Sequence, residues 1–212
     1  MGHSSVDLAQ DPGSAASLPI ALTTPHRVLL STETVTARIA EMGREIGDAY
    51  GDERPVLIAV LKGAFVFLSD LSRALTVPHE VDFLTCSSYG DRTTSSGTVI
   101  IHHDVRTSLK GRQVLVVEGV VDTGHTLREI LTHLRQHEPA GIKVATLLDK
   151  VPCRKVPVDV HYVGFRIADE FVVGYGMDYA GYLRNLPYVG VIETSGSSAV
   201  SETVACDPQS TT

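Results

Sequence analysis

Few cysteines occur in the sequence, and they are not arranged for any common cysteine chemistry. The three residues, Cys86, Cys153 and Cys206, are odd in number and widely separated. No C-x-x-C pair is present that could hold zinc or exchange disulfides. We therefore expect free thiols.

Long apolar runs and clusters of basic residues are also missing. No stretch approaches the ~20 apolar residues that span a bilayer, and the N-terminus has neither the basic start nor the apolar segment of a secretory signal. The formal net charge is −7, without the clustered Lys and Arg that bind phosphate backbones. We expect a cytoplasmic protein that binds neither membranes nor nucleic acid.

The composition present is that of a globular protein. Of the 212 residues, 43% are hydrophobic and 20% are charged, which is typical of a folded soluble chain. Residues 1–25 and 194–212 are polar and without periodicity, so we expect both to be disordered tails. The length then favours one domain over residues 26–193.

Apolar spacing predicts alternating helices and strands. Three sets of residues recur at helical spacing: Val35, Ile39, Met42 and Ile46; Ala64, Leu68, Leu71 and Leu75; and Leu127, Ile130, Leu131 and Leu134. Apolar or β-branched runs predict strands at 56–61, 80–87, 98–102, 114–117, 144–148, 158–165, 171–173 and 189–192. This alternation indicates an α/β fold with a mainly parallel central sheet flanked by helices.

One segment, V-L-V-V-E-G-V-V-D-T-G-H-T-L at 114–127, predicts a strand, a loop and the start of a helix. Ligands of open α/β sheets bind at the carboxyl ends of strands. Gly124 permits close backbone approach, and the free amides of a helix N-terminus suit a phosphate monoester. The loop is neither a P-loop nor a dinucleotide motif. An ordinary helix start, capped by Asp122 or Thr123, explains it equally well.

The acid before this loop favours a ligand site. Glu118 is expected at the end of a buried strand, where a carboxylate is costly unless a ligand hydroxyl, a cation or a metal compensates it. His102, His103 and His125 do not predict a zinc site, because adjacent histidines on a strand point to opposite faces.

The strand, the acid and the D-T-G-x-T loop resemble the phosphoribosyl pyrophosphate motif of the type I phosphoribosyltransferases. Further segments resemble the hypoxanthine-guanine branch of that family: L-K-G-A at 61–64, S-S-Y-G at 87–90, S-S-G at 95–97, and D-E-F-V-V-G-Y-G-M-D-Y at 169–179 followed by Y-L-R-N-L-P-Y. The resemblance covers nearly all of residues 26–193.

The resemblance implies a purine salvage enzyme. Such an enzyme transfers the 5-phosphoribosyl group from phosphoribosyl pyrophosphate to hypoxanthine or guanine, or to xanthine, with Mg²⁺, and releases the nucleoside monophosphate and pyrophosphate. It also implies a small hood built from terminal segments and a homodimer or homotetramer. Which 6-oxopurine is preferred stays open.

The resemblance also implies roles for residues around the sugar and phosphates. Glu118 would bind ribose and magnesium, and Asp122 would remove the proton from N7 of the purine. Lys62 and Gly63, in a loop that often contains a cis peptide, would bind pyrophosphate together with Arg184. The 5-phosphate would be held by Asp122, Thr123, Gly124, His125 and Thr126.

Around the purine, Lys150 would donate to O6 and so select oxopurines over adenine. Phe171 would stack on the ring, and the backbone of Val172 would read its edge. Asp178 would lie beside the purine and bind a second magnesium ion. The residues alone leave simpler alternatives open, including core packing for Phe171 and a surface ion pair for Arg184.

Residues 87–97 are small and polar with two glycines, as in a mobile loop. By the resemblance, Ser88 and Tyr89 would close over the reactive sugar and exclude water. An ordinary hairpin loop is the alternative.

Gly119 departs from the family, which usually has a second acid there. Losing one charged hydrogen bond to ribose costs ~1.5 to 3 kcal/mol, or roughly 10- to 150-fold in affinity. We therefore expect an active enzyme with weaker phosphoribosyl pyrophosphate binding. A nucleotide-binding regulator of the same fold that has lost turnover is the alternative hypothesis.

Overall fold

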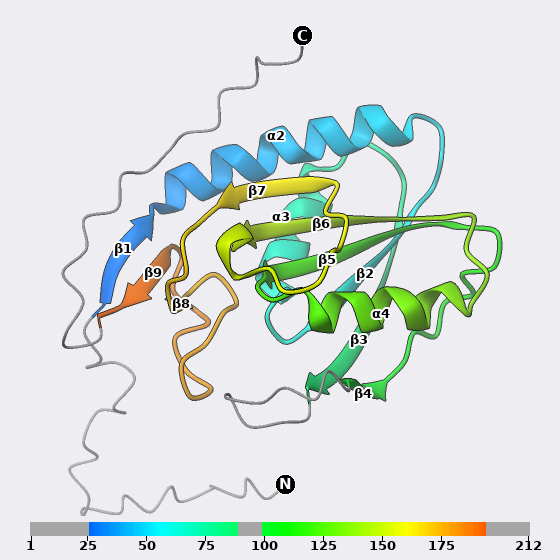
Figure 1. Cartoon of the computed structure of the whole chain (residues 1–212). Helices are drawn as coiled ribbons and strands as arrows, with labels where there is room; N and C mark the ends of the chain where they lie inside the picture. Colours follow the sequence, from blue (N-terminus) through cyan, green and yellow to red (C-terminus); the bar gives the residue numbers. More distant parts are fainter. Residues whose placement is uncertain (1–25, 89–98, 194–212) are drawn as a thin grey trace, which may run out of the picture.

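The computed structural model describes residues 26–88 and 99–193. The two predicted tails lie outside the described residues, as does Tyr89. The described chain forms two β-sheets and three α-helices (Figure 1). None of the described helices is both long enough and apolar enough to span a membrane.

The larger sheet has six strands in the order β4-β3-β2-β5-β6-β7. All neighbouring strands are parallel except β3 and β4, which confirms the mainly parallel sheet. The strands are β2 (Val56–Leu61), β3 (Glu80–Ser88), β4 (Val99–His103), β5 (Gln113–Val121), β6 (Gly141–Asp149) and β7 (Tyr162–Arg166).

The continuous apolar run of β2 is buried along nearly its whole length because both faces of the sheet are covered. Leu57 and Ala59 pack into a core with α2 (Thr32–Tyr50) and α3 (Phe65–Ala74). Val56 and Ile58 point the other way and pack against α4 (His125–Arg135). This alternation along one strand builds two cores, and Figure 1 shows α2 above the sheet and α4 below it.

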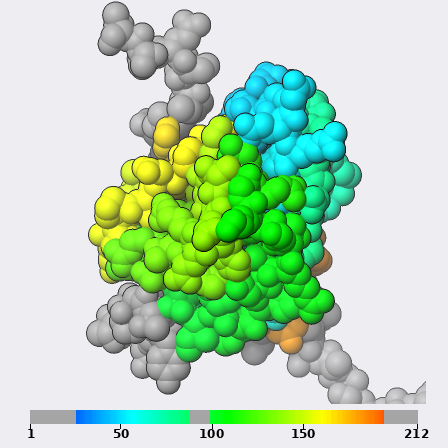
Figure 2. Space-filling view, turned by 90° about the vertical axis from the view of Figure 1, so that its right-hand side faces the viewer, coloured from blue at the N-terminus to red at the C-terminus, as the bar shows by residue number. Residues whose placement is uncertain are grey.

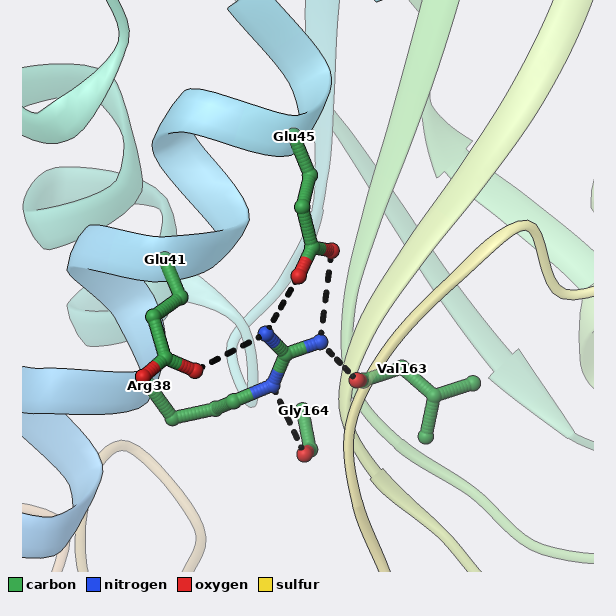
Figure 3. A network of polar contacts seen from close by, with 5 residues as sticks. All are labelled: Arg38, Glu41, Glu45, Val163 and Gly164. Atoms are coloured by element: carbon green, nitrogen blue, oxygen red, sulfur yellow. Dashed lines mark hydrogen bonds and ion pairs between the residues drawn. The ribbon is translucent and has the colours of Figure 1, made fainter. Parts of the chain in front are cut away.

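Helix α2 is fixed to the edge strand β7 by one arginine (Figure 3). Arg38 donates through Nε to the carbonyl of Gly164 at 3.2 Å and through Nη2 to the carbonyl of Val163 at 2.9 Å. Its Nη1 lies 2.7 Å from Glu45 and 3.2 Å from Glu41 on the same helix. The guanidinium therefore has a partner at every nitrogen.

The smaller sheet is an antiparallel hood built from both ends of the described chain, as predicted. It has the order β1-β9-β8, with β1 at His26–Leu30, β9 at Val189–Ile192 and β8 at Val172–Val173. Figure 1 shows it beside the ends of β5 and β6.

The predicted boundaries need several corrections. Strand β1 and a 3₁₀ turn at Val151–Cys153 were not predicted. The strand predicted at 158–165 begins only at Tyr162, where pairing with Ala145 of β6 starts. Strand β5 continues to Val121, so Glu118 lies inside a strand and not at its end.

Candidate active site

The candidate site lies where three neighbouring parallel strands end. Lys62 follows β2, Asp122 follows β5 and Lys150 follows β6. Because β2, β5 and β6 are adjacent in the sheet, their carboxyl ends meet at one edge, the usual place for a ligand in this architecture.

Lys150 and Asp122 face each other at this edge. The Lys150 ammonium lies 3.6 Å from the Asp122 carboxylate and 3.7 Å from that of Asp169. Lys150 is only 7% exposed, whereas half of the Asp122 side chain is accessible. A nearly buried cation thus lies beside two accessible carboxylates, of which Asp169 was not predicted.

Arg154, also not predicted, binds the backbone of Asp122. Its Nη1 donates to the backbone carbonyl of Asp122 at 2.9 Å, and its Nη2 pairs with the Asp149 carboxylate. The Cys153 thiol lies nearby, and burial together with the carboxylates of Asp169 and Asp122 raises its pKa to about 11. It is therefore a neutral thiol at neutral pH.

The loop after β5 leaves the start of α4 open. The N-cap is Gly124, with φ +87°, and no side chain caps this helix among the described residues. The alternative in which Asp122 or Thr123 caps the helix is therefore wrong. A Cβ at Gly124 would lie 2.9 Å from the Val156 carbonyl, so both the conformation and the space require glycine.

The rest of this loop is held by its backbone. The carbonyl of Thr123 accepts from the amides of Lys155 and Val156 at 3.0 and 3.2 Å. His125 and Thr126 form the first turn of α4, and Nδ1 of His125 is buried without a hydrogen-bond partner among the described residues. The uncapped first turn can offer its amides to an anion.

Glu118 is a half-buried acid with one fully buried oxygen that lacks a partner. Its Oε2 has no hydrogen-bond partner within the described part of the chain. Burial raises the pKa of Glu118 to about 8, although the amide of Gly119 acts in the opposite direction. Without a ligand, this carboxyl therefore keeps its proton at neutral pH.

Three glycines meet beside Glu118. A Cβ at Gly119 would lie 2.8 Å from the carbonyl oxygen of Gly63, and a Cβ at Gly176 would lie 2.4 Å from the same oxygen. The loop of Gly63 also contains a cis peptide between Leu61 and Lys62, as the resemblance implied. The backbone of this loop occupies the space that a second acid at position 119 would need.

Arg184 and Asp178 form a pair beside these glycines. Arg184 Nη2 lies 2.6 Å from Asp178 Oδ1, and its Nη1 donates to the Gly176 carbonyl at 2.6 Å. The other carboxylate oxygen of Asp178 accepts from the Gly181 amide at 2.8 Å. The alternative interpretation of Arg184 was an ion pair. Arg184 does form one, but its partner, Asp178, is itself a predicted site residue.

Phe171 is 42% exposed, so the core-packing alternative is wrong. Its ring meets Tyr179 edge to face, with centroids 5.8 Å apart, and part of the Phe171 side chain stays accessible. Val172, next in the chain, is buried in β8. Ser88 ends β3, and its predicted companion Tyr89 lies outside the described residues.

Comparisons with known proteins show which sequences this chain resembles. A family model described as a phosphoribosyl transferase domain matches residues 29–180. The hypoxanthine-guanine phosphoribosyltransferase of Mycobacterium avium is 48% identical over 78% of this chain and 85% of its own length. The hypoxanthine phosphoribosyltransferase of Salmonella typhimurium is 46% identical, over 78% of this chain and 94% of that protein.

A solved structure is similar as well. A hypoxanthine-guanine phosphoribosyltransferase of Bacillus anthracis superimposes with a TM-score of 0.76 and 41% sequence identity, covering 79% of this chain and 98% of that one.

Proposed function

Because the chain belongs to the phosphoribosyltransferase family, in which its relatives are purine salvage enzymes, we propose that it transfers the phosphoribosyl group of phosphoribosyl pyrophosphate to hypoxanthine or guanine. IMP or GMP and pyrophosphate are the products. The observation that carries this proposal is the 3.6 Å approach of Lys150 to Asp122 at the edge of the sheet.

That pair matches one edge of a 6-oxopurine, where O6 and N7 are neighbours. Lys150 donates to O6, and the Asp122 carboxylate accepts the proton from N7. As that proton leaves, N9 forms a bond to C1 of the ribose and the bond from C1 to the pyrophosphate oxygen breaks. Adenine has no acceptor at position 6 and would leave a buried donor unpaired, which excludes it.

The phosphates are bound mainly by backbone. The amides of the first turn of α4, with the loop from Asp122 to Thr126, hold the 5-phosphate. Lys62 and Gly63 hold pyrophosphate through their backbone, while Arg184 adds a permanent charge.

Glu118 and Asp178 fit magnesium, because their carboxylate oxygens are the ligands this ion prefers. Glu118 has a buried oxygen without a partner, suited to a ribose hydroxyl or to a magnesium ion on the ribose. Bound magnesium would neutralise the charge that develops on pyrophosphate.

The remaining residues select and shield the substrates. Phe171 stacks its exposed face on the purine, and the backbone of Val172 reads the purine edge. Shielding of the sugar from water is proposed for Ser88 and for Tyr89, which lies outside the described residues.

Association of two copies is part of the proposal. Val81, Phe83 and Ile100 are large apolar side chains exposed on the adjacent strands β3 and β4, a surface suited to a partner. We expect a homodimer or homotetramer, in which each chain contributes one domain at residues 26–193. Light scattering measures the number of chains. Cytoplasmic location remains a prediction.

The test is turnover of the purified full chain with phosphoribosyl pyrophosphate, magnesium and one base at a time. Hypoxanthine and guanine should give monophosphates, xanthine tests the open preference, and adenine should give none. Equal use of adenine would contradict the role of Lys150. Nucleotide binding without turnover of any base would instead support the regulatory alternative, although the relatives are named as enzymes.

A further inference from the structure

A second cluster of ligand-type side chains lies away from the site. Asp104 directly follows β4, His133 is in the last turn of α4, and His137 comes just after that helix. One donor atom from each residue lies within 4.8 Å of the other two, the single such group among residues 26–88 and 99–193. Helix α4 begins at the phosphate loop, so this cluster lies at its opposite end.

The surface at that end is accessible. Figure 2 faces the side of the molecule where the central strands begin, and residues of the green segments that include α4, β5 and β6 cover much of it. The side chains of Asp104, His133 and His137 are 41%, 26% and 31% exposed. These side chains are therefore partly accessible, although Nε2 of His133 itself is buried.

The two histidines are held on one face by helical geometry. They are four residues apart, the spacing that places side chains one above the other. The turn continues past the end of α4, since the amides of Gln136 and His137 donate to the carbonyls of His133 and Leu134. The rings lie 5.3 Å apart at 71°, so their nitrogens can approach one ion from separate directions.

Asp104 completes the group. Its Oδ1 lies 2.9 Å from Nε2 of His133, and its Oδ2 lies 3.4 Å from Nε2 of His137. Metal–ligand bonds of about 2.0 to 2.1 Å in a tetrahedral site separate donor atoms by roughly 3.3 Å. These two separations are close to that requirement, and the two imidazole nitrogens lie within 4.8 Å of each other.

Nε2 of His133 lies close to Asp104 but does not form a well-aligned hydrogen bond with it. This nitrogen is buried and makes no hydrogen bond within the described chain, despite the short distance to Asp104. The nitrogen therefore does not point along a line to the carboxylate oxygen. Two donors directed at a shared ion would have this arrangement.

The carboxylate is also held by its own backbone. Oδ1 of Asp104 accepts from the amide of Val105 at 2.8 Å. Metal binding uses a deprotonated carboxylate oxygen and neutral imidazoles.

We propose that Asp104, His133 and His137 form a binding site for a divalent transition-metal ion of the zinc class. Two imidazoles and one carboxylate favour such borderline ions over magnesium. A bound ion would link the end of β4 to the end of α4 and would hold the helix whose start forms the phosphate loop. The site is structural and takes no part in the transfer.

The experiment measures Zn²⁺ affinity of the full chain by competition with a chromophoric chelator. Excess magnesium is present so that the active-site carboxylates are occupied by their preferred ion. Wild type is compared with His133→Gln, His137→Gln and Asp104→Asn. His103→Gln is the matched control, because His103 is exposed on β4 immediately before Asp104.

We expect one ion per chain in wild type and in the control. Each of the three site variants should bind about 100-fold more weakly or worse, since loss of even an outer-shell partner costs about 10- to 100-fold. Zn²⁺ should also raise the Tm of wild type and of the control but not of the site variants. Co²⁺ should show the absorption of a site with nitrogen ligands.

Equal affinity in wild type and the site variants would overturn the proposal, as would the absence of a tight site in wild type. If a glutamine variant does not fold, Asp104→Asn tests the proposal instead. This variant keeps the size of the side chain and the oxygen that accepts from Val105, so we expect it to fold. Unchanged Zn²⁺ affinity in folded Asp104→Asn also overturns it.

Discussion

Arg38 and Glu118 are ionisable side chains of one molecule with opposite surroundings. Each nitrogen of Arg38 has a partner in α2 or β7 (Figure 3), whereas the buried Oε2 of Glu118 has none among the described residues. A charge that only holds the fold together is satisfied within the chain. A buried polar group left unsatisfied in the strand that leads into the phosphate loop indicates that a ligand completes it.

The largest expected effect concerns the candidate active site. Asp122→Asn should lower kcat by about 10²- to 10⁴-fold, because the amide cannot accept the proton from N7. Its effect on the free energy of unfolding should be small, since half of the side chain is accessible. Steady-state kinetics with hypoxanthine and a denaturant titration measure both.

Asp169→Asn is the matched control for that experiment. Asp169 lies as close to Lys150 as Asp122 does, at 3.7 Å, but it has no assigned proton transfer. It should lower kcat far less. Equal losses in the two variants would mean that the pairing of Lys150, and not a base at Asp122, sets the rate.

Glu118→Gln should raise KM for phosphoribosyl pyrophosphate by roughly 10- to 150-fold, equivalent to one charged hydrogen bond of ~1.5 to 3 kcal/mol. Kinetics at saturating hypoxanthine measure this change. A KM within twofold of wild type would show that the unsatisfied oxygen of Glu118 is not the ribose ligand.

The same variant has a pH signature. The pKa of Glu118 is raised from its ordinary 4.5 to about 8 in the folded chain, so the folded state binds more protons than the unfolded state between these values. The contribution to stability is complete below pH 4.5 and is lost as the pH rises to about 8. Denaturant titrations at several pH values should show this loss of unfolding free energy in wild type and not in Glu118→Gln. If the unfolding free energy of both proteins changes equally with pH, the raised pKa of Glu118 is contradicted.

Gly119→Ala should destabilise the fold by about 1 to 3 kcal/mol, because its Cβ would lie 2.8 Å from the Gly63 carbonyl and the backbone must shift. Gly119→Asp carries the same steric cost and adds the acid usual in the family. Compared with the alanine variant, it should bind phosphoribosyl pyrophosphate more tightly. Equal KM values in the two variants would mean that the missing acid does not limit binding.

The smallest effect is expected at Arg38, whose nitrogens all have partners within the chain. Arg38→Met keeps an aliphatic stem in the side chain but removes the guanidinium and its bonds to Val163 and Gly164, whose carbonyls can rebind water at this partly accessible edge. The loss in unfolding free energy should be about 1 kcal/mol, with KM and kcat unchanged. A kinetic change would show that α2 and the site are coupled.

The sequence alone predicted the elements that follow from local patterns. Strand β2 was predicted with its observed bounds, because burial on both faces requires a continuous apolar run. Strand β1 was missed because H-R-V-L-L is short and half polar, and its partner β9 lies at the other end of the domain. Only the tertiary pairing makes it a strand.

In the candidate site, too, local patterns were predicted and tertiary contacts were missed. The motif residues were predicted from types and spacing, and the structure brings Asp122 and Lys150 together. Asp169 and Arg154 were missed because their roles depend on contacts between loops. His133 and His137 carried a signal, four-residue spacing on a predicted helix, but Asp104 joins them only through the fold.

The contact of Gly63 with Gly119 and Gly176 has a consequence for the order of mutations during divergence. The three positions are far apart in sequence, yet each limits the others through one carbonyl oxygen. Substitutions among contacting residues are not additive. A side chain at position 119 therefore requires the loop at Gly63 to shift. We expect that a lineage gaining an acid at position 119 changes this loop earlier or at the same step. An acid acquired alone would destabilise the fold before its charge improved binding.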